Sequence, residues 1–519
     1  MKKIIVVLLT VFMTFNIFAQ GNQEASNDGL TTIELWYGAA VSEAGNLPDD
    51  WIGYQILKDK YQIDLKLTML PSDMNDRDVK VQAAGAANNL PDLFMVSRSV
   101  LINLVKQGLV ATVDDMYEKM PIRSANHYDQ ASIQHSTING HSYGLASAGA
   151  VSKNEGILIR KDWLDNLGLD IPTTTDELMN VMRAFTFDDP DGNGKDDTYG
   201  FGAYVESNVE LKGYPGSRMF PILGAFNVAG LWSFEEETAG LNVYRPEFYD
   251  AMCYIRQMQK EGVIDPNWLS YKKDDFRAAW KQGRFGIMWE QNSALASESN
   301  YTPFDKNFPE GEWIVLDAIK NPDGTGKAGA YDMTFRIFAI SKKAEDAGKK
   351  DKIAQLLEWM SSDEGYYLIG WGQEGVNYVL DENGVPSAGN LGDNAFSGTK
   401  GQLYTQLRNL VFYNSDTELV SRYPSYTAPY SGKEMSALKV LREMQACDLQ
   451  SAIGSNSMPT PNADVRRFYE QTLSEFLTGA RELTPENWQS FIDQFNQLGG
   501  KAWNDAGVQF MKDNGFIIQ

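Results

Sequence analysis

The sequence is poor in cysteine and histidine, the residues on which much protein chemistry depends. Only two cysteines, Cys253 and Cys447, and three histidines, His127, His135 and His141, occur in 519 residues. Two distant cysteines make neither a disulfide framework nor a Cys-x-x-Cys site; they leave open one disulfide or two free thiols. The histidine spacing fits no zinc-ligand pattern. An HExxH motif is also absent, so the sequence offers no zinc protease site.

Positive charge is scarce as well. The chain has 46 Lys and Arg against 69 Asp and Glu, a net charge of −23. Affinity for nucleic acid depends on clustered Lys and Arg that neutralise phosphates, and no such cluster follows the N-terminal lysines. We therefore expect no nucleic-acid partner and interpret the acidity as favouring solubility.

Long apolar runs are absent except at the N-terminus. Lys2 and Lys3 precede an apolar run from Ile4 to Phe15, and a small residue, Ala19, follows it. This pattern predicts a signal peptide at 1–19, too short to span a membrane, and the polar residues 20–29 predict a disordered spacer. No cysteine near the cleavage region offers a lipid attachment site. The sequence therefore predicts a periplasmic protein, with an uncleaved N-terminal anchor as the alternative.

The length and the strand pattern predict a multidomain α/β protein. A chain of 519 residues exceeds the size at which one core usually stops growing. Segments 31–38 and 63–70 alternate apolar and polar residues as strands do. Between them, four residues mark one helix face: Trp51, Tyr54, Leu57 and Tyr61. This is a βαβ unit with parallel strands, and a second helix at about 78–87 leads to a buried strand at 93–96.

The stretch from 156 to 200 carries the most specific pattern. An apolar run at 157–159 predicts a buried strand, and Thr174 with Glu177 predicts a capping box that starts an amphipathic helix. The loop after that helix places oxygen-bearing side chains at positions 1, 3, 5 and 9 of a calcium loop: Asp189, Asp191, Asn193 and Asp197. Gly194 at position 6 permits the sharp turn.

The remaining calcium ligands are less regular. Lys195 at position 7 would offer its carbonyl oxygen, whereas position 12 is Gly200 where a bidentate Glu is usual. Asp196 or the Thr198 hydroxyl could substitute. We expect a structural Ca²⁺ held by the four side chains named above with Lys195 and Thr198. A metal-free loop of Asp, Asn and Gly is the alternative.

Two segments identify a family resemblance. IRKDWLDNLGLDIPTTTDEL at 159–178 and DPDGNGKDDTYG at 189–200 resemble extracellular solute-binding proteins, family 1, of ABC importers, in the branch that serves oligosaccharides. Weaker similarity covers much of the remaining chain: 90–96, 105–121, 280–289, 338–365 and 372–378. Within the first segment, Trp163 and Leu167 are predicted to pack beneath a sheet.

The resemblance implies a two-lobed periplasmic binding protein-like fold of type II. Each lobe would be a mostly parallel sheet flanked by helices, with a helix-rich C-terminal part. We place the first lobe at 30–145 plus 328–368, the second at 155–320 plus 369–519, and the crossovers near 143–157 and 310–328. A carbohydrate, expected to be an oligosaccharide, would bind between the lobes, which close by hinge rotation and dock on permease subunits as a monomer.

The same resemblance implies binding without catalysis. A secreted, calcium-containing, glycoside-active enzyme is the enzymatic alternative, because 69 acidic residues can readily place two carboxylates at glycosidase separation. A sugar-binding adhesin or sensor module is the second alternative. Product formation from an oligosaccharide would favour the enzyme, and loss of uptake on deletion would favour import.

Candidate sugar-binding residues follow from where strands end. A pyranose needs aromatic rings against its apolar face and charged or amide groups beside its hydroxyls, and open α/β sheets bind ligands at the carboxyl ends of strands. The candidates lie at such ends or in the turn at 372–378, which approaches the cleft in relatives: Trp36, Tyr37, Arg98, Trp289, Glu290, Tyr331, Asp332, Trp371 and Glu374. Each aromatic could instead belong to the core. These positions offer few cations, which favours a neutral sugar over a uronic acid.

Overall fold

The computed structural model describes residues 29–40, 45–71, 74–148, 153–206, 212–331, 335–411, 416–452, 455 and 458–518. The predicted signal peptide, all of the predicted spacer except Gly29, and the candidate Asp332 lie outside these residues. Within them, no helix is long and apolar enough to cross a membrane.

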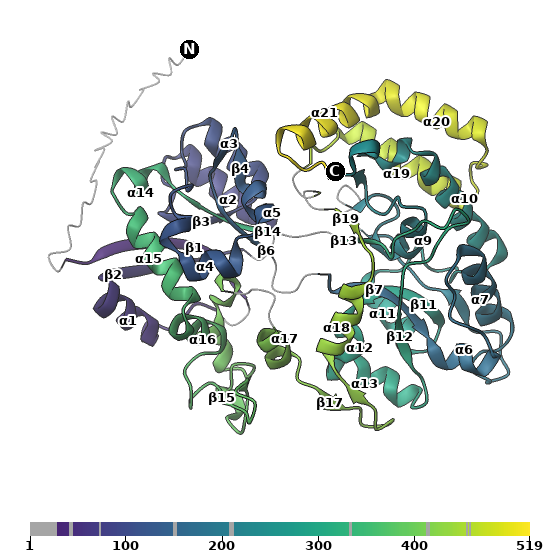
Figure 1. Cartoon of the computed structure of the whole chain (residues 1–519), viewed down its shortest axis with the longest axis horizontal. Coiled ribbons are helices and arrows are strands. Elements are labelled where there is room, and N and C mark those ends of the chain that lie inside the picture. Colours follow the sequence, from purple (N-terminus) through teal and green to yellow (C-terminus); the bar gives the residue numbers. More distant parts are fainter. Residues whose placement is uncertain are drawn as a thin grey trace, which may run out of the picture.

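The chain forms two α/β lobes that lie side by side (Figure 1). The first lobe contains a five-stranded sheet of order β2-β1-β3-β14-β6. Its strands are β1 (Thr31–Gly38), β2 (Ile63–Leu70), β3 (Leu93–Val96), β6 (Leu145–Ala148) and β14 (Phe335–Ile340). Its helices are α1 (Ile52–Tyr61), α2 (Met74–Ala86), α3 (Arg98–Lys106), α4 (Pro121–His127), α5 (Gln130–Ser136), α14 (Lys342–Asp346), α15 (Lys350–Ser361) and α16 (Asp363–Trp371).

The predicted βαβ unit is confirmed. β1 and β2 pair in parallel from Thr31 opposite Ile63 to Gly38 opposite Leu70, with α1 between them in sequence. Successive side chains of β1 point to opposite faces of the sheet. Tyr37 joins the core that includes residues of α1 and α15, and Trp36 packs against the core that includes residues of α2 and α3. The sheet is therefore covered on both faces.

The second lobe contains a four-stranded sheet of order β12-β7-β11-β8. Its strands are β7 (Glu155–Arg160), β8 (Tyr199–Phe201), β11 (Phe285–Gln291) and β12 (Trp313–Leu316). Its helices are α6 (Lys161–Leu167), α7 (Thr175–Phe187), α9 (Phe220–Ala225), α10 (Pro246–Glu261), α11 (Lys273–Lys281), α12 (Asn292–Ala296), α13 (Glu298–Asn307), α18 (Ala437–Ala446), α19 (Ala463–Thr478), α20 (Pro485–Leu498) and α21 (Gly500–Asp513). As predicted, α7 begins with a capping box between Thr174 and Glu177.

The strand directions differ from the expected mostly parallel sheets. In the second lobe β7 is antiparallel to both β11 and β12, and only β11 and β8 run parallel. In the first lobe β14 is antiparallel to β3 and β6. The βαβ argument concerns strands joined by one helix, whereas β14 enters its sheet from the other lobe. The two-lobed α/β fold thus stands, with mixed sheets.

The lobe boundaries also differ from those expected. The first crossover, between β6 and β7, lies within the expected region at 143–157. The expected return at 310–328 is wrong, because β13 (Ala330–Tyr331) pairs with β19 (Gln450–Ser451) of the second lobe. The chain therefore returns between β13 and β14.

Residues 369–411 belong to the first lobe, not to the second as expected. Leu407, Leu410 and Val411 join its core, so burial of their apolar side chains decides the assignment. The chain crosses again after 411 through α17 (Asp416–Arg422). This helix contacts both lobes, because the Ser421 hydroxyl accepts a hydrogen bond from Trp371 of α16 and Asp416 pairs with Arg442 of α18.

Candidate functional site

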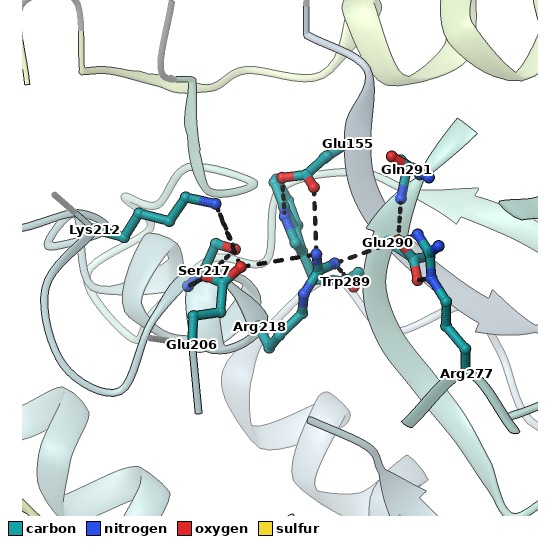
Figure 2. A network of polar contacts seen from close by, with 9 residues as sticks. All are labelled: Glu155, Glu206, Lys212, Ser217, Arg218, Arg277, Trp289, Glu290 and Gln291. Carbon is teal, nitrogen blue, oxygen red and sulfur yellow. Dashed lines mark hydrogen bonds and ion pairs between the residues drawn. The ribbon is translucent and has the colours of Figure 1, made fainter. Parts of the chain in front are cut away.

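A cluster of polar side chains lies at one edge of the second sheet (Figure 2). β7 begins at Glu155, directly after the first crossover, and the antiparallel β11 ends at Gln291 opposite it. The start of one strand and the end of the other therefore meet at the same edge. Figure 1 shows β7 on the side of this lobe that faces the first lobe. The sheet thus presents this edge toward the crossovers.

Arg218 is the centre of this cluster. Its side chain is 5% exposed, and Nη1 donates a hydrogen bond of 2.6 Å to the carbonyl oxygen of Trp289. Three carboxylates surround the guanidinium: Glu155 at 3.4 Å, Glu290 at 3.5 Å and Glu206 at 3.9 Å. Burial would lower the pKa of Arg218, but these carboxylates outweigh it and raise the pKa. Arg218 therefore stays charged and fixed.

The carboxylates hold further cations. Glu290, with a 1% exposed side chain, accepts two hydrogen bonds from Arg277, at 3.0 and 3.1 Å. Glu206 accepts hydrogen bonds from the Ser217 backbone and hydroxyl and pairs with Lys212 at 3.4 Å. Burial would raise the pKa of Glu206 and Glu290, but the neighbouring cations hold each pKa below its usual value. Both remain ionised at neutral pH.

This arrangement suits binding better than acid catalysis. Glycosidases need one carboxyl group with a raised pKa as the general acid. Glu206 and Glu290 have lowered pKa values instead. Glu155 is the more accessible carboxylate of the three, and one of its oxygens accepts a hydrogen bond of 3.1 Å from Trp289 Nε1. A fixed carboxylate of this kind can accept hydrogen bonds from sugar hydroxyls.

The expectation that Trp289, Trp371 and Tyr37 are exposed aromatic platforms is wrong for this structure. Each ring is buried. Trp289 meets the ring of Phe220 edge-on at 5.7 Å, and Arg422 lies over Trp371 at 5.2 Å. Tyr37 faces the core of the first lobe. A residue at a strand end is exposed only when no other segment covers it, and here other segments do.

Three further candidates, Trp36, Glu290 and Tyr331, contact other side chains of the protein. Trp36 is half-buried, and Lys80 of α2 lies 5.1 Å from its ring centre, on the helix-covered face of the sheet. Glu290 belongs to the Arg218 cluster. Tyr331 is half-buried in β13, with Lys153 of the first crossover 5.8 Å from its ring. Glu374 is exposed in the turn that follows α16. Of these, Tyr331 and Glu290 lie close to the crossovers.

Arg98 contacts the second lobe. It is buried, and its guanidinium donates hydrogen bonds to the backbone oxygens of His135 and Thr137 and to the side chain of Asn514. It also lies over the rings of Phe510 and Phe516, at 5.5 and 6.0 Å. We therefore correct its expected role: here Arg98 ties the first lobe to the C-terminal segment.

The predicted calcium loop is folded as a compact turn. Asp189 Oδ1 and Oδ2 accept hydrogen bonds from the backbone of Asn193 and Gly194, at 3.0 and 2.9 Å. The side-chain nitrogen of Asn193, Nδ2, donates hydrogen bonds to Asp191 Oδ2 at 2.9 Å and to Asp197 Oδ1 at 3.2 Å. Lys195 donates its backbone N–H to Asn193 Oδ1. The backbone thus adopts φ values of 47° at Asp189 and 76° at Gly194.

The carboxylate oxygens of this loop are ligands of the kind that a hard cation such as Ca²⁺ prefers. Burial raises the pKa of Asp191, and the Asp189 and Asp197 carboxylates raise it further, so a divalent cation would relieve their repulsion. In this conformation, the described residues contain no group of three or more His, Cys, Asp or Glu in position to hold a metal. Thr198, the other expected ligand, is buried here, and its hydroxyl donates to the carbonyl of Phe185.

Comparison with known proteins identifies the family. The model of the family described as "Bacterial extracellular solute-binding protein" matches residues 49–367, more than half of the chain. The chain belongs to this family. A relative, the polygalacturonan/rhamnogalacturonan-binding protein YtcQ of Bacillus subtilis (strain 168), is 28% identical over 327 residues. The alignment spans 62% of this solute-binding protein and 62% of YtcQ, less than two thirds of the relative.

Solved structures share the two-lobed fold. The HMO-binding, ABC-transporter-associated solute-binding protein from Bifidobacterium longum infantis matches with a TM-score of 0.66 at 17% identity, over 94% of this chain and 99% of that chain. An EF-hand mutant of the Streptococcus pneumoniae substrate-binding protein FusA, in complex with fructo-nystose, matches with a TM-score of 0.61 at 17% identity, over 93% and 99% of the two chains. At such identities the likeness concerns the fold alone.

Sequence reasoning missed most of the polar cluster in this solute-binding protein. Only Trp289 and Glu290 were candidates, whereas Glu155, Glu206 and Arg218 were not. Glu155 could have been found, since it lies two residues before the predicted strand at 157–159 and within the predicted crossover at 143–157. No sequence pattern marks Arg218, which reaches the cluster from the short helical turn Ser217–Met219.

Proposed function

We propose that this solute-binding protein captures an oligosaccharide between its two lobes and delivers it to the permease subunits of an ABC importer. The observation that carries the proposal is the fixed Arg218 cluster, at the edge of the second sheet beside the crossovers. Its side chains are already oriented and charged, so a ligand would meet preorganised hydrogen-bonding groups. A secretion signal at 1–19 and a periplasmic location belong to the same proposal.

Capture would depend on a change in the position of the two lobes relative to each other, from an open to a closed state. Each lobe has its own core, and connecting segments join the two. A ligand that contacts both lobes in a closed state, and only one in an open state, shifts the population toward the closed state by its differential affinity. The permease would then recognise the closed protein. No bond is made or broken in this cycle.

A thermal-shift screen tests this function. Oligosaccharides of two to six residues, both neutral and acidic, are added to the purified protein. A ligand at about 100 times its dissociation constant should add roughly 2.7 kcal/mol of apparent stability. Chromatography of each hit after incubation should recover it unchanged. Products would favour a glycoside-active enzyme. If a sugar stabilises the purified protein, but a strain in which its gene is deleted still takes up that sugar, an adhesin or sensor is favoured.

We propose in addition that the loop at 189–197 holds a structural Ca²⁺. Asp189, Asp191, Asn193 and Asp197 would supply side-chain oxygens and Lys195 its carbonyl oxygen. Asn193 would need to turn its amide oxygen inward, an exchange of two nearly isosteric atoms. The FusA structure compared above is of an EF-hand mutant, so an EF-hand exists in that protein, which supports looking for a cation here.

Chelation is expected to lower the unfolding temperature. Without the cation the carboxylates of Asp189, Asp191 and Asp197 repel one another, so bound Ca²⁺ would stabilise the folded loop. Differential scanning calorimetry with EDTA and with added Ca²⁺ measures the effect. Asp191→Ala should abolish the response. Asp323→Ala, in the comparable polar loop at 321–327, should leave it intact. An identical melting curve with EDTA and with Ca²⁺ would contradict the proposal.

A further inference from the structure

A cavity of about 360 Å³ lies in the second lobe, between the first turns of α10 and of α20. None of its lining residues belongs to the Arg218 cluster. Cavities of roughly 300 to 1,000 Å³ commonly hold small organic ligands, which aromatic walls and a few polar groups recognise. Both kinds of side chain line this cavity: Tyr244, Tyr249, Trp488, Arg245, Asp250 and Gln489.

The cavity forms where two helices begin beside each other. α10 starts at Pro246 and α20 at Pro485, and both prolines line the cavity. Proline fits the first position of a helix, and its short, rigid ring does not reach into the space between the two helix starts. Tyr249 and Trp488 each follow three residues later, on the same helix face as the proline. These two residues therefore form walls of the cavity.

The aromatic walls are held in place by the core. Trp488 and Tyr249 are half-buried, and their rings meet edge-on with centres 5.4 Å apart. Phe476 and Phe491, which are buried, lie 5.6 and 5.1 Å from Trp488. The Trp488 ring is thus fixed by packing while part of it lines the cavity. Such a preformed aromatic surface matches the apolar face of a pyranose.

Polar atoms beside these rings can bond a ligand. Gln489 Nε2 donates to Asp493 at 2.9 Å, which fixes the amide group. Within the described residues, no donor is bonded to Gln489 Oε1 or to the carboxylate of Asp250, and no acceptor to Trp488 Nε1. These atoms offer two acceptors and one donor to the hydroxyl groups of a sugar.

The charges of the cavity favour an uncharged ligand. Arg245 Nη1 donates to the carbonyl oxygen of Asn227 at 2.6 Å, and its Nε lies 3.4 Å from Glu247. The guanidinium is therefore already bound by the protein. Asp250 adds a negative charge on the same lining. A ligand with a full charge of either sign would meet a like charge here.

A larger and more open hollow of about 770 Å³ adjoins the cavity along α20. The two share Pro485 and Gln489. The other side chains of this hollow are all polar: Glu486, Ser490, Asp493, Gln494 and Gln497. Amides and hydroxyls bond sugar hydroxyls, whereas the two carboxylates would repel a uronic acid. A sugar chain that ends in the cavity can therefore continue along this helix.

We propose that this cavity is a second carbohydrate site, which binds the end of a neutral glycan chain. The terminal pyranose places its apolar face against Trp488 and Tyr249, and its hydroxyls bond Gln489 and Asp250. A quaternary ammonium ion also binds aromatic rings. The guanidinium of Arg245 would repel such a cation, so the sugar is the better occupant.

The second site goes beyond capture between the lobes. Figure 1 shows α10 and α20 on the side of the second lobe that faces away from the first lobe. Binding there needs no contact with the first lobe and no closure. A glycan chain held at this site raises the local concentration of its sugars around the protein.

Fluorine magnetic resonance of protein labelled with 5-fluorotryptophan tests the site, because each tryptophan reports on its own surroundings. Trp488→Phe, Trp289→Phe and Trp163→Phe assign three resonances by their disappearance. The neutral probes are maltotriose, cellotriose, xylotriose, β-1,4-mannotriose and carboxyl-reduced trigalacturonate, and the charged probes are trigalacturonate and choline. At least one neutral probe should shift the Trp488 resonance to saturation. The resonance of Trp163, which is fully buried, should not move.

Variants show whether the shift arises from contact with the sugar. Gln489→Ala and Asp250→Ala each remove one bonding group, and each should weaken the binding seen at Trp488 about threefold to tenfold. Both side chains are exposed, so these variants should fold. Gln471→Ala is the matched control. Gln471 is also exposed on a helix and donates to the acidic residue four positions later, Glu475, at 2.8 Å. It lies outside the cavity, so its loss should leave the binding unchanged.

Trp289, in the Arg218 cluster, separates this site from the proposed function. Weaker binding at Trp488 in Gln489→Ala, with the response of Trp289 unchanged, supports the second site. One dissociation constant at both tryptophans, unaffected by Gln489→Ala, would make the shift at Trp488 a consequence of binding between the lobes and overturn the inference. A Trp488 resonance that no neutral probe moves, or that choline or trigalacturonate moves at lower concentration, overturns it as well and leaves the proposed function standing. If Trp488 responds and Trp289 does not, the second site stands and capture between the lobes loses its support.

Discussion

Replacing Arg218 with methionine is expected to lower the free energy of unfolding by about 3 to 5 kcal/mol. Arg218 is buried among Glu155, Glu206 and Glu290, and the substitution leaves their carboxylates with one fewer cation in a poorly solvated site. Removing one partner of a buried ion pair costs more than the pair itself contributes, because the remaining charge stays buried. Urea unfolding monitored by tryptophan fluorescence measures the change.

The free energy of unfolding that Arg218→Met loses relative to wild type should be smaller at acidic pH. In the folded protein the pKa of Glu206 and of Glu290 lies below its usual value, largely through Lys212, Arg218 and Arg277 acting against burial. A lowered folded-state pKa contributes stability above the unfolded-state pKa, and that stability is lost as pH falls through the folded-state pKa. The difference between wild type and Arg218→Met should therefore narrow below about pH 4.3, the usual value for Glu.

Arg467→Met supplies the matched control. Its side chain is exposed on α19, where it pairs with Asp464, so the expected change is within about 0.5 kcal/mol. A loss in Arg218→Met that stays constant as the pH falls from neutral to well below about pH 4.3 would mean that packing of the arginine stem, and not its charge, stabilises this edge. In that case the ion network would not be the source of the predicted destabilisation.

Sequence patterns predicted several strands and helices well, because these elements form through interactions between residues that are close in sequence. β1 and β2 occupy the predicted segments, since alternation along a strand and one helical turn pattern suffice to define a βαβ unit. The capping box at Thr174 formed because both partners lie within one turn of the chain. Trp163 is buried as predicted, and Leu167 packs against the same core.

The surroundings of the candidate binding residues could not be predicted, because they are formed by segments that are distant in sequence. Trp289 follows a buried strand and lay at a plausible edge, yet Phe220 and Glu155 cover it from other segments. Arg98 also follows a strand, yet the C-terminal residue Asn514 reaches it. The alternation of a strand predicts which face a side chain points to, and it says nothing of which segment lies opposite.

Replacing Trp163 with alanine is expected to lower the free energy of unfolding by about 3 to 5 kcal/mol. Trp163 is 0% exposed in the second lobe's core. Its ring meets Phe185 of α7 edge-on at 5.2 Å, and the Arg160 guanidinium lies 4.6 Å from the ring centre. Alanine would remove the apolar burial and leave a cavity between α6, α7 and β11 that these elements can fill only in part.

Phe187→Ala provides the comparison, because Phe187 is a large apolar residue at the end of the same helix α7 and is 61% exposed. Its loss should change stability by no more than about 0.5 kcal/mol. The two variants are compared by urea unfolding and by titration with the best sugar from the thermal-shift screen. Trp163→Ala should keep the sugar affinity under native conditions, since the ring contacts α7 and lies away from the crossovers. Unchanged stability with lost affinity would instead place Trp163 in the ligand site, because only a residue that touches the ligand would give that combination.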